Sequence, residues 1–377
     1  MIINMASVNY GHQKRDMNNT DLNHTAELFN IEGAALSITP LGNGHINDTF
    51  LVVTDSARYV VQRINTHVFR SPDQLMHNIK AVTDFTHSRM QVITSRDGGL
   101  YAVTPDCHWR MMTYIENSYT CERVESPEQF REIGRAYGSF IQELAGFPAE
   151  DLYETIEGFH DTRRRFEQLM QACEADPVGR KHTAMAELRF ACERGKDTDV
   201  LNDCVRRGEI PLRVTHNDTK INNVLLDRDT GKAVCVIDLD TVMPGLAVND
   251  FGDAIRSGAS TGKEDEGDPE QVRLDLDLYR SYAAGFIAGC PDLTEKEIEL
   301  MPIGARLMAL ECGIRFLTDY IEGDHYFKTA YSEHNLIRCR AQFRLVQEME
   351  EHWEEMQASV NTSYRCNSCR RLQAGSN

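Results

Sequence analysis

Three polar side chains within residues 214–256 have the types and the spacing that phosphoryl transfer requires. Asp218 and Asn223 lie in a polar loop after a short apolar segment, and Asp238 follows a later apolar segment. A turn at residues 227–231 divides the apolar residues between them, which predicts a hairpin that returns Asp238 to the loop. A carboxylate can orient an attacking hydroxyl, and an amide oxygen with a second carboxylate can hold Mg²⁺ against phosphates. We therefore expect Asp218 to be the catalytic base, with Asn223 and Asp238 as Mg²⁺ ligands; the alternative is an ordinary polar loop between two strands.

This loop resembles the catalytic core of kinases but departs from the protein-kinase version. His216–Asp218 stands where protein kinases have His-Arg-Asp, Asp238–Asp240 stands where they have Asp-Phe-Gly, and no Ala-Pro-Glu follows. The pattern is similar to the aminoglycoside phosphotransferase-like family of small-molecule kinases. Four longer strings resemble the bacterial N-acetylhexosamine 1-kinases: Arg213–Lys220, Ile237–Gly245, Asp250–Asp253 and Glu311–Leu317.

The resemblance covers roughly residues 29–356 and implies an α+β, two-lobed protein-kinase-like fold, with a small antiparallel-sheet N-lobe and a larger, mainly helical C-lobe. It implies ATP and Mg²⁺ as cofactors, and the anomeric hydroxyl of N-acetylglucosamine or N-acetylgalactosamine as the acceptor. The alternative within this fold is another acceptor, such as an aminoglycoside, choline, homoserine or methylthioribose. The alternative outside enzymes is an inactive kinase-like binding module, against which the intact catalytic and Mg²⁺-binding residues argue.

Residues 38–53 have the pattern of a strand, a Gly-x-Gly turn and a strand, which is typical of the hairpin that covers the nucleotide in kinases. Gly42 and Gly44 have no Cβ that would keep backbone N–H groups away from phosphate oxygens. Asn47 and Thr49 of the same hairpin are further candidates for nucleotide binding. The alternative is a tight turn without this role.

The third predicted strand, residues 58–64, carries Gln62 where kinases usually have a lysine that holds the α- and β-phosphates. Gln62 stays a candidate nucleotide-binding residue, but a neutral amide cannot supply the positive charge. That charge must come from Mg²⁺, from backbone donors or from a neighbour such as Arg63. Because side chains alternate along a strand, only one of Gln62 and Arg63 can face the nucleotide, and the sequence leaves both open.

The predicted helix 304–321 has apolar residues around its whole circumference, so it should be largely buried. Glu311, Arg315 and Asp319 follow one another at intervals of four, which is compatible with a structural ladder of ion pairs. Alternatively, Arg315 faces the cleft and donates hydrogen bonds to the substrate. The resemblance favours the second interpretation, with Tyr326 as a companion.

The resemblance also gives roles to three other residues. His45, a large side chain at a turn that should stay small, is placed near the sugar, where Asp218 also contacts the acceptor; the alternative is a surface histidine. Asp250 is expected to support the catalytic loop, although it could instead cap the next helix. Ser257 stands where the hexosamine kinases carry an aromatic residue, which predicts relaxed selectivity among sugars.

The elements expected around these residues divide the chain into four segments. These are a disordered N-terminus (1–24), an N-lobe (25–116), a helical C-lobe (117–357) and a disordered tail (358–377). Ser71 and Pro72 predict the start of the N-lobe helix, since serine caps helices and proline suits the first helical position. The C-lobe should end in one long helix, Glu333–Met356.

Composition limits the partners of the chain. Its 377 residues include 40 Lys and Arg and 58 Asp and Glu, so the formal net charge of −18 predicts no nucleic-acid partner. Eleven scattered cysteines are typical of reduced thiols and predict a cytoplasmic location. No apolar run approaches the ~20 residues of a membrane span, and residues 1–23 do not resemble a signal peptide. We expect a small-molecule sugar partner and no membrane partner.

Overall fold

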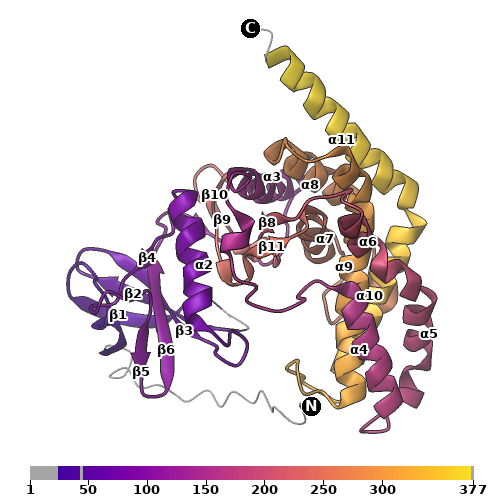
Figure 1. Ribbon diagram of the computed structural model, residues 1–377, viewed down its shortest axis with the longest axis horizontal. Coiled ribbons are helices and arrows are strands. Elements are labelled where there is room, and N and C mark those ends of the chain that lie inside the picture. The colour runs from indigo at the N-terminus through magenta and orange to yellow at the C-terminus, as the bar shows by residue number, and fades with distance from the viewer. Residues whose placement is uncertain (1–23, 43–45, 375–377) are drawn as a thin grey trace.

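A computed structural model describes residues 24–42 and 46–374. They form a smaller lobe, an antiparallel sheet with one long helix, and a larger, mainly helical lobe (Figure 1). This is the predicted α+β, two-lobed arrangement. No helix of residues 24–42 and 46–374 combines the length and the apolar character that crossing a membrane requires.

The strands are β1 (Ala35–Pro40), β2 (Asp48–Thr54), β3 (Arg58–Ile64), β4 (Val92–Ile93), β5 (Ala102–Thr104), β6 (Cys107–Thr113), β7 (Ser118–Tyr119), β8 (Arg213–Thr215), β9 (Val224–Asp227), β10 (Ala233–Val236) and β11 (Met243–Gly245). The helices are α2 (Pro72–Phe85), α3 (Pro127–Glu143), α4 (Thr162–Ala175), α5 (Met185–Glu193), α6 (Val200–Arg206), α7 (Ala247–Gly258), α8 (Leu276–Gly289), α9 (Glu295–Glu322), α10 (His334–Glu351) and α11 (Trp353–Ala374).

The N-lobe sheet has the strand order β1-β2-β3-β6-β4, with β5 paired to β6, and all pairs are antiparallel. Its register places Thr49 opposite Gln62, and Gln62 opposite Arg110. Cross-strand partners point to the same face of a sheet, so these three side chains form one row across β2, β3 and β6.

Helix α2 begins as predicted. The Ser71 side chain accepts a hydrogen bond from the backbone N–H of Gln74, and Pro72 occupies the first helical position. The helix connects the lobes, because the side-chain amide of Asn78 donates to the carbonyl oxygens of Tyr153 (2.7 Å) and Val242 (3.1 Å) in the larger lobe. These bonds fix the N-lobe sheet relative to the segment that follows β10.

Short strands of the larger lobe carry the polar loop singled out in the sequence. The predicted hairpin is present as β9 and β10, and β8 pairs with β11. β7 pairs with β9, so the chain enters this lobe at the hairpin. The loop at 216–223 is therefore enclosed by backbone pairing on both sides.

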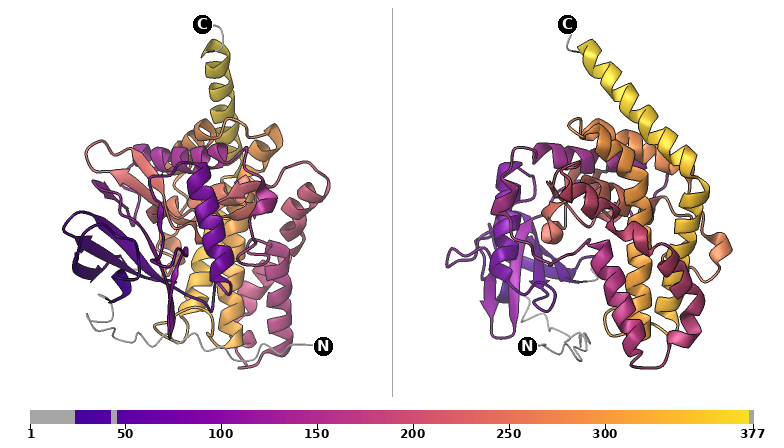
Figure 2. Two further views of the ribbon diagram at one scale, coloured as in Figure 1. Left: turned by 60° about the vertical axis from the view of Figure 1, so that its left-hand side comes forward. Right: turned by 45° about the vertical axis from the view of Figure 1, so that its right-hand side comes forward.

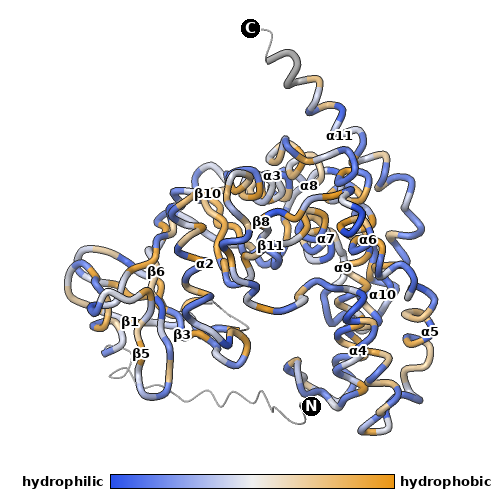
Figure 3. Tube along the Cα trace, viewed as in Figure 1, coloured by the Kyte–Doolittle hydropathy of each residue, from blue (hydrophilic) through white to orange (hydrophobic). Residues whose placement is uncertain are grey.

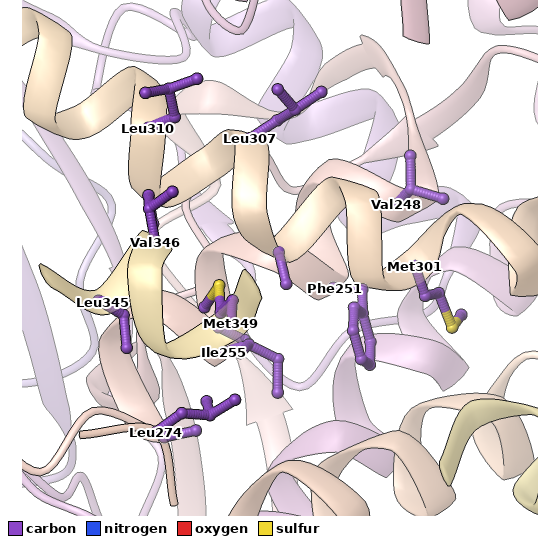
Figure 4. Close-up of a cluster of buried hydrophobic side chains, with 14 of the residues drawn as sticks. Val248, Phe251, Ile255, Leu274, Met301, Leu307, Leu310, Leu345, Val346 and Met349 are labelled. Carbon is purple, nitrogen blue, oxygen red and sulfur yellow. The ribbon is translucent and has the colours of Figure 1, made fainter. Parts of the chain in front are cut away.

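Helices α7 and α9 cross at a contact between glycines. A Cβ on Gly252 would lie 2.5 Å from the carbonyl oxygen of Gly304, and a Cβ on Gly304 would lie 2.2 Å from that of Val248. Figure 4 shows the apolar side chains around the crossing, from α7, α9 and α10. Figure 3 shows apolar residues gathered on central helices such as α8, whereas α11 is mostly hydrophilic. The close crossing fixes the distance between two helices that carry candidate site residues.

The structure differs from the predicted elements at the C-terminal end. Helix α9 begins at Glu295, before the predicted start at residue 304, and is continuous through Pro302, because residues on both sides of the proline are buried in the core. The single helix predicted over residues 333–356 is divided at His352 into α10 and α11. Residues 358–374, predicted to be disordered, continue α11, since Met356 and Val360 pack in the core. The last turns of α11 project from the body of the molecule (Figure 2).

We predict that Gly252→Ala destabilises the protein by about 1–3 kcal/mol, because the added Cβ meets backbone atoms of α9 that cannot move independently. Glycine to alanine within a helix ordinarily stabilises by up to ~1 kcal/mol, so the expected sign is opposite to that of helix propensity. Urea unfolding measures the change. Gly267→Ala is the control, since nothing lies within 4 Å of its Cβ position; an equal or higher stability for Gly252→Ala would contradict the close crossing.

Candidate active site

Asp250 holds the loop that follows β8. Its two carboxylate oxygens accept hydrogen bonds from the backbone N–H groups of His216 (2.8 Å) and Asn217 (2.7 Å). Burial raises the pKa of Asp250 to about 6, although its contacts with His216 and Asn217 act in the opposite direction. The predicted support of the loop by Asp250 is confirmed, and the capping alternative is wrong, because α7 begins without a side-chain cap.

His216 and Asn217 connect the loop to the segment after β10. The backbone N–H of Asp218 donates to His216 Nδ1 (3.3 Å), and His216 Nε2 donates to the carbonyl oxygen of Ile237 (2.9 Å). The side-chain amide of Asn217 donates to the carbonyl oxygen of Thr241 at 3.0 Å. Asn217 itself has a left-handed backbone with φ 63°, which turns the chain sharply before Asp218.

Asp218 and Asn223 lie together, as the sequence predicted. Asn223 Nδ2 donates to the backbone oxygen of Asp218 (2.9 Å) and to its Oδ2 (3.3 Å). Lys220 Nζ lies 2.8 Å from Asp218 Oδ1. Burial would raise the pKa of Asp218, but the charge and hydrogen bond of Lys220 outweigh it, so the pKa is lowered and the carboxylate is ionised at neutral pH. The sequence interpretation missed Lys220, whose signal was a cation two residues after the candidate base.

The backbone brings Asp238 back to this loop. The N–H of Ile237 donates to the carbonyl oxygen of Asn223 at 2.9 Å, so Asp238 follows a residue bonded to the loop. Asp238 has a left-handed backbone (φ 60°, ψ 58°), which is uncommon for a residue other than glycine and turns the chain at this point. Burial, then the negative charges of Asp240 and Asp218, raise the pKa of Asp238 to about 7.

This concentration of negative charge fits a divalent cation. Among the described residues, no group of three or more His, Cys, Asp or Glu side chains could hold a metal ion without other donors. Mg²⁺ usually takes one or two carboxylates and completes its octahedral shell with water and substrate phosphates. Asp238 and Asn223 are therefore a plausible donor set for Mg²⁺ only together with a phosphate-bearing ligand.

The candidate nucleotide-binding residues of the N-lobe have different environments. Gln62 Nε2 donates to Thr49 Oγ1 at 3.0 Å, within the row across the sheet. Both polar atoms of the Asn47 side chain form hydrogen bonds within the protein: Nδ2 donates to Asp240 (2.6 Å) and Oδ1 accepts from the backbone N–H of Asn65 (3.0 Å). Its side chain is thus an unsuitable nucleotide ligand. Gly42 has φ +69°, with nothing within 4 Å of a Cβ position; Gly44 and His45 lie outside the described residues.

Arg110 of β6 is a site residue that the sequence interpretation missed. Its guanidinium is fully buried, forms an ion pair with Asp240 of the larger lobe and donates from Nε to Gln62 Oε1 at 2.9 Å. Arg63, considered above as the source of positive charge, instead forms an ion pair with Asp48. The signal for Arg110 in the sequence was a cation between the apolar residues Trp109 and Met111.

Glu311, Arg315 and Asp319 do not form a ladder. Glu311 contacts His160 Nδ1 (3.1 Å) and accepts from Thr162 Oγ1 (2.8 Å). The carboxylate of Asp319 accepts three backbone N–H groups at 2.7–2.9 Å, from residues 325–327. The ion-pair ladder considered in the sequence is therefore absent, and each of the two carboxylates has partners other than Arg315.

Arg315 lies among aromatic rings. Its guanidinium carbon is 5.8 Å from the ring centres of Phe159 and Tyr326 and 5.6 Å from that of Phe327, and its Nη2 donates to the Tyr326 hydroxyl at 3.4 Å. Arg165 of α4 also contacts Phe159, because its Nη2 donates to the carbonyl oxygen of Phe159 at 3.1 Å. Burial and then the charge of Arg315 lower the pKa of Arg165. Two arginines and a tyrosine hydroxyl thus form a donor-rich region.

His160 connects this region to the catalytic loop. Its Nε2 donates to the carbonyl oxygen of Asn217 (2.7 Å), while its Nδ1 faces Glu311. Burial lowers the pKa of His160, but the hydrogen bond and charge of Glu311 outweigh it and raise the pKa. Asp161 caps α4 by accepting a hydrogen bond from the backbone N–H of Arg164. The sequence interpretation assigned no role to His160.

Comparisons with known proteins agree with this geometry. The family model described as "Phosphotransferase enzyme family" matches residues 37–284. A microcompartment-associated aminopropanol kinase superposes with a TM-score of 0.61 at 18% identity, over 90% of this chain and 99% of that one. Spectinomycin phosphotransferase in complex with ADP and spectinomycin superposes with a TM-score of 0.57 at 13% identity, over 90% of this chain and 100% of that one. Choline kinase from Cryptosporidium parvum superposes with a TM-score of 0.57 at 12% identity, over 92% of this chain and 99% of that one. At these identities the likeness concerns the fold, and it confirms the predicted fold class.

We predict that Glu311→Gln lowers the melting temperature most between about pH 4.5 and 6.5. Burial would raise the pKa of Glu311, but His160 lowers it, so this contribution to stability is present above the ordinary Glu value of 4.5. The raised pKa of His160 means that its contribution is complete below the ordinary value of 6.5 and is lost as pH rises through the raised pKa.

Melting curves of wild type and variant across pH 4–9 test this. Glu167→Gln is the control, because Glu167 forms a surface pair with Arg163 and has no histidine partner. A difference between wild type and Glu311→Gln that stays constant as the pH rises would show that the buried pair is not charged.

Proposed function

Because the chain belongs to the phosphotransferase enzyme family, we propose that it is an ATP-dependent kinase that phosphorylates the anomeric hydroxyl of N-acetylhexosamines. The products are the sugar 1-phosphate and ADP. The observation that carries this proposal is the position of Arg315 and Tyr326 in a donor-rich region that His160 and Glu311 connect to the catalytic loop.

Asp218, Asn223 and Asp238 would have different roles in phosphoryl transfer. Asp218, ionised beside Lys220, accepts a hydrogen bond from the anomeric hydroxyl and takes its proton as the bond between that oxygen and the γ-phosphorus forms. The bond from the γ-phosphorus to the bridging oxygen breaks, and ADP leaves. Mg²⁺, held by Asn223 and Asp238, would offset the negative charge on the phosphates.

The charges around the loop favour a neutral acceptor. Three buried carboxylates of α7 and α9 already have charged or backbone partners: Asp250 holds the loop, Asp253 pairs with Arg256 through Oδ1 (2.7 and 2.9 Å), and Glu311 faces His160. Asp253 Oδ2 is buried and has no hydrogen-bond partner among the described residues. A cationic acceptor, such as an aminoalcohol, would need a carboxylate without such a partner. The donors of Arg315 and Tyr326 instead suit sugar hydroxyls and the carbonyl oxygen of a 2-acetamido group.

The selectivity among sugars is expected to be broad. Ser257, half-buried at the end of α7, donates to the carbonyl oxygen of Ala254 (3.2 Å) and offers no aromatic ring for stacking on a sugar. Stacking contributes to sugar recognition through apolar contact, which a serine cannot supply. We therefore include hexoses without the 2-acetamido group among the substrates to be tested.

We predict that ADP release from ATP in the presence of Mg²⁺ depends on the acceptor. N-acetylglucosamine or N-acetylgalactosamine should support turnover, whereas choline, ethanolamine and aminoglycosides should not. Asp218→Asn should lower kcat by about 10²–10⁴-fold and leave sugar binding nearly unchanged, because the hydroxyl loses its base but not its other contacts. Asp229→Asn, in the exposed turn between β9 and β10, is the control. If an aminoalcohol supports ADP release and the sugars do not, the proposed acceptor is wrong and the aminoalcohol takes its place. Full activity of Asp218→Asn would refute the role of Asp218.

A further prediction concerns Arg315. Arg315→Met should raise the KM for the sugar at least about 10-fold, since charge-assisted hydrogen bonds to substrate are lost, and it should leave the KM for ATP within about twofold. Arg163→Met, on the outer side of α4, removes an arginine that pairs with Glu167 and Asp199 at the surface. It should change neither constant. A larger effect on ATP than on the sugar would exclude Arg315 from the acceptor site.

A further inference from the structure

Arg110 is a buried cation with one donor group left unused. Its side chain has 0% exposure, its Nε donates to Gln62, and its Nη1 forms the ion pair with Asp240. Its Nη2 is also buried and finds no hydrogen-bond partner within residues 24–42 and 46–374. Because an unpaired buried N–H on a charged group is costly, this nitrogen points to an acceptor that is not part of the described chain.

The unused donor lies at the active site. Thr49, Gln62 and Arg110 form the row across β2, β3 and β6, and Asp240 of the larger lobe contacts the end of this row. Asp240 is two residues after Asp238, the expected Mg²⁺ ligand. Because Arg110 pairs with Asp240, its guanidinium lies beside the segment that would hold Mg²⁺ and the nucleotide phosphates.

Two other cations near this position, Lys220 and Arg63, already form ion pairs with aspartates. Lys220 Nζ contacts both carboxylate oxygens of Asp218, at 2.8 and 3.1 Å. Arg63 pairs with Asp48 and alternates to the face of β3 opposite Gln62. In kinases a cation from the N-lobe binds the nucleotide phosphates, and in protein kinases it is a β3 lysine paired with a glutamate. Here the corresponding β3 residue, Gln62, is neutral.

We propose that Arg110 is the phosphate-binding cation of the N-lobe, with Nη2 donating to an α- or β-phosphate oxygen of the bound nucleotide. Asp240 neutralises and orients the guanidinium in the absence of nucleotide, and Gln62 fixes its Nε. The charge that kinases place on β3 is thus supplied from the neighbouring strand β6. The inference rests on the proposed function, from which it takes the nucleotide.

The planar guanidinium explains how one side chain can serve both partners. Its five N–H groups point in fixed directions, so Nη1 and Nε can remain bonded to Asp240 and Gln62 while Nη2 reaches a phosphate. A lysine in the same place has a single ammonium group that cannot hold this geometry. Gln62 is in turn oriented by Thr49, which makes both of them positioning residues rather than phosphate ligands.

The test separates phosphate recognition from folding by comparing two ligands. Calorimetric titration of the full chain with ADP and with adenosine, both with Mg²⁺, gives the gain in affinity that the phosphates supply. Arg110→Met should weaken ADP binding by about 10- to 100-fold and leave adenosine binding within about twofold, because hydrogen bonds to charged groups are lost only with ADP. Arg110→Lys should recover part of the loss, since it restores the charge but not the fork.

Arg63→Met is the matched control, because it removes a second arginine–aspartate pair from the same sheet on the opposite face. Its ratio of ADP to adenosine affinity should equal that of wild type. If Arg110→Met fails to fold because Asp240 is left uncompensated, the double variant Arg110→Met with Asp240→Asn removes both charges and is titrated in its place. A folded variant whose ratio is unchanged overturns the assignment of Arg110.

These titrations contain no sugar, so they are independent of the acceptor. A loss of ADP affinity in Arg110→Met supports the inference even if N-acetylhexosamines prove not to be substrates. If wild type releases ADP in a sugar-dependent way but Arg110→Met keeps the wild-type ratio of ADP to adenosine affinity, the inference is overturned and the proposed function stays intact. A wild-type chain that binds neither ADP nor adenosine would overturn both.

Discussion

Three carboxylates in one small region between the lobes set the main electrostatic constraint on this structure. After burial, the negative charges of Asp240 and Asp218 are the causes that raise the pKa of Asp238. The protein compensates two of them by itself, with Lys220 beside Asp218 and Arg110 beside Asp240. Asp238 is left with a raised pKa. A divalent cation with a nucleotide would complete the compensation, which explains why a Mg²⁺-dependent transfer suits the site.

The same constraint connects the two lobes. Asp240 accepts hydrogen bonds from Asn47 and Arg110, so the N-lobe sheet reaches the segment that carries Asp238 through a buried carboxylate. On the other side, the close crossing of α7 and α9 fixes Asp250 relative to Glu311. Breaking one partner of such a buried pair leaves an uncompensated charge, which costs more than the loss of a surface pair. The geometry of the loop therefore depends on contacts from both lobes.

Sequence patterns predicted the parts of the site that depend on local structure. The β9–β10 hairpin, the capping of α2 by Ser71 and the meeting of Asp218 with Asn223 follow from turn residues, alternation and capping chemistry. The same reasoning failed for α9, which extends from Glu295 through Pro302 beyond the predicted helix 304–321, and for the tail, where polar composition suggested disorder. In both places tertiary packing of a few buried apolar residues outweighed the local preference.

The sequence by itself determined the loop of candidate catalytic residues and the family to which the chain belongs, because those residues lie close together in a strand-loop-hairpin unit whose pairing is set by alternation. Only the tertiary structure revealed the buried contacts of Arg110, His160 and Asn47. Arg110 and Asp240 are 130 positions apart, and His160 and Glu311 are 151 positions apart. Such contacts depend on strand order, on helix crossings and on how the lobes meet, and no pattern of neighbouring residues records these.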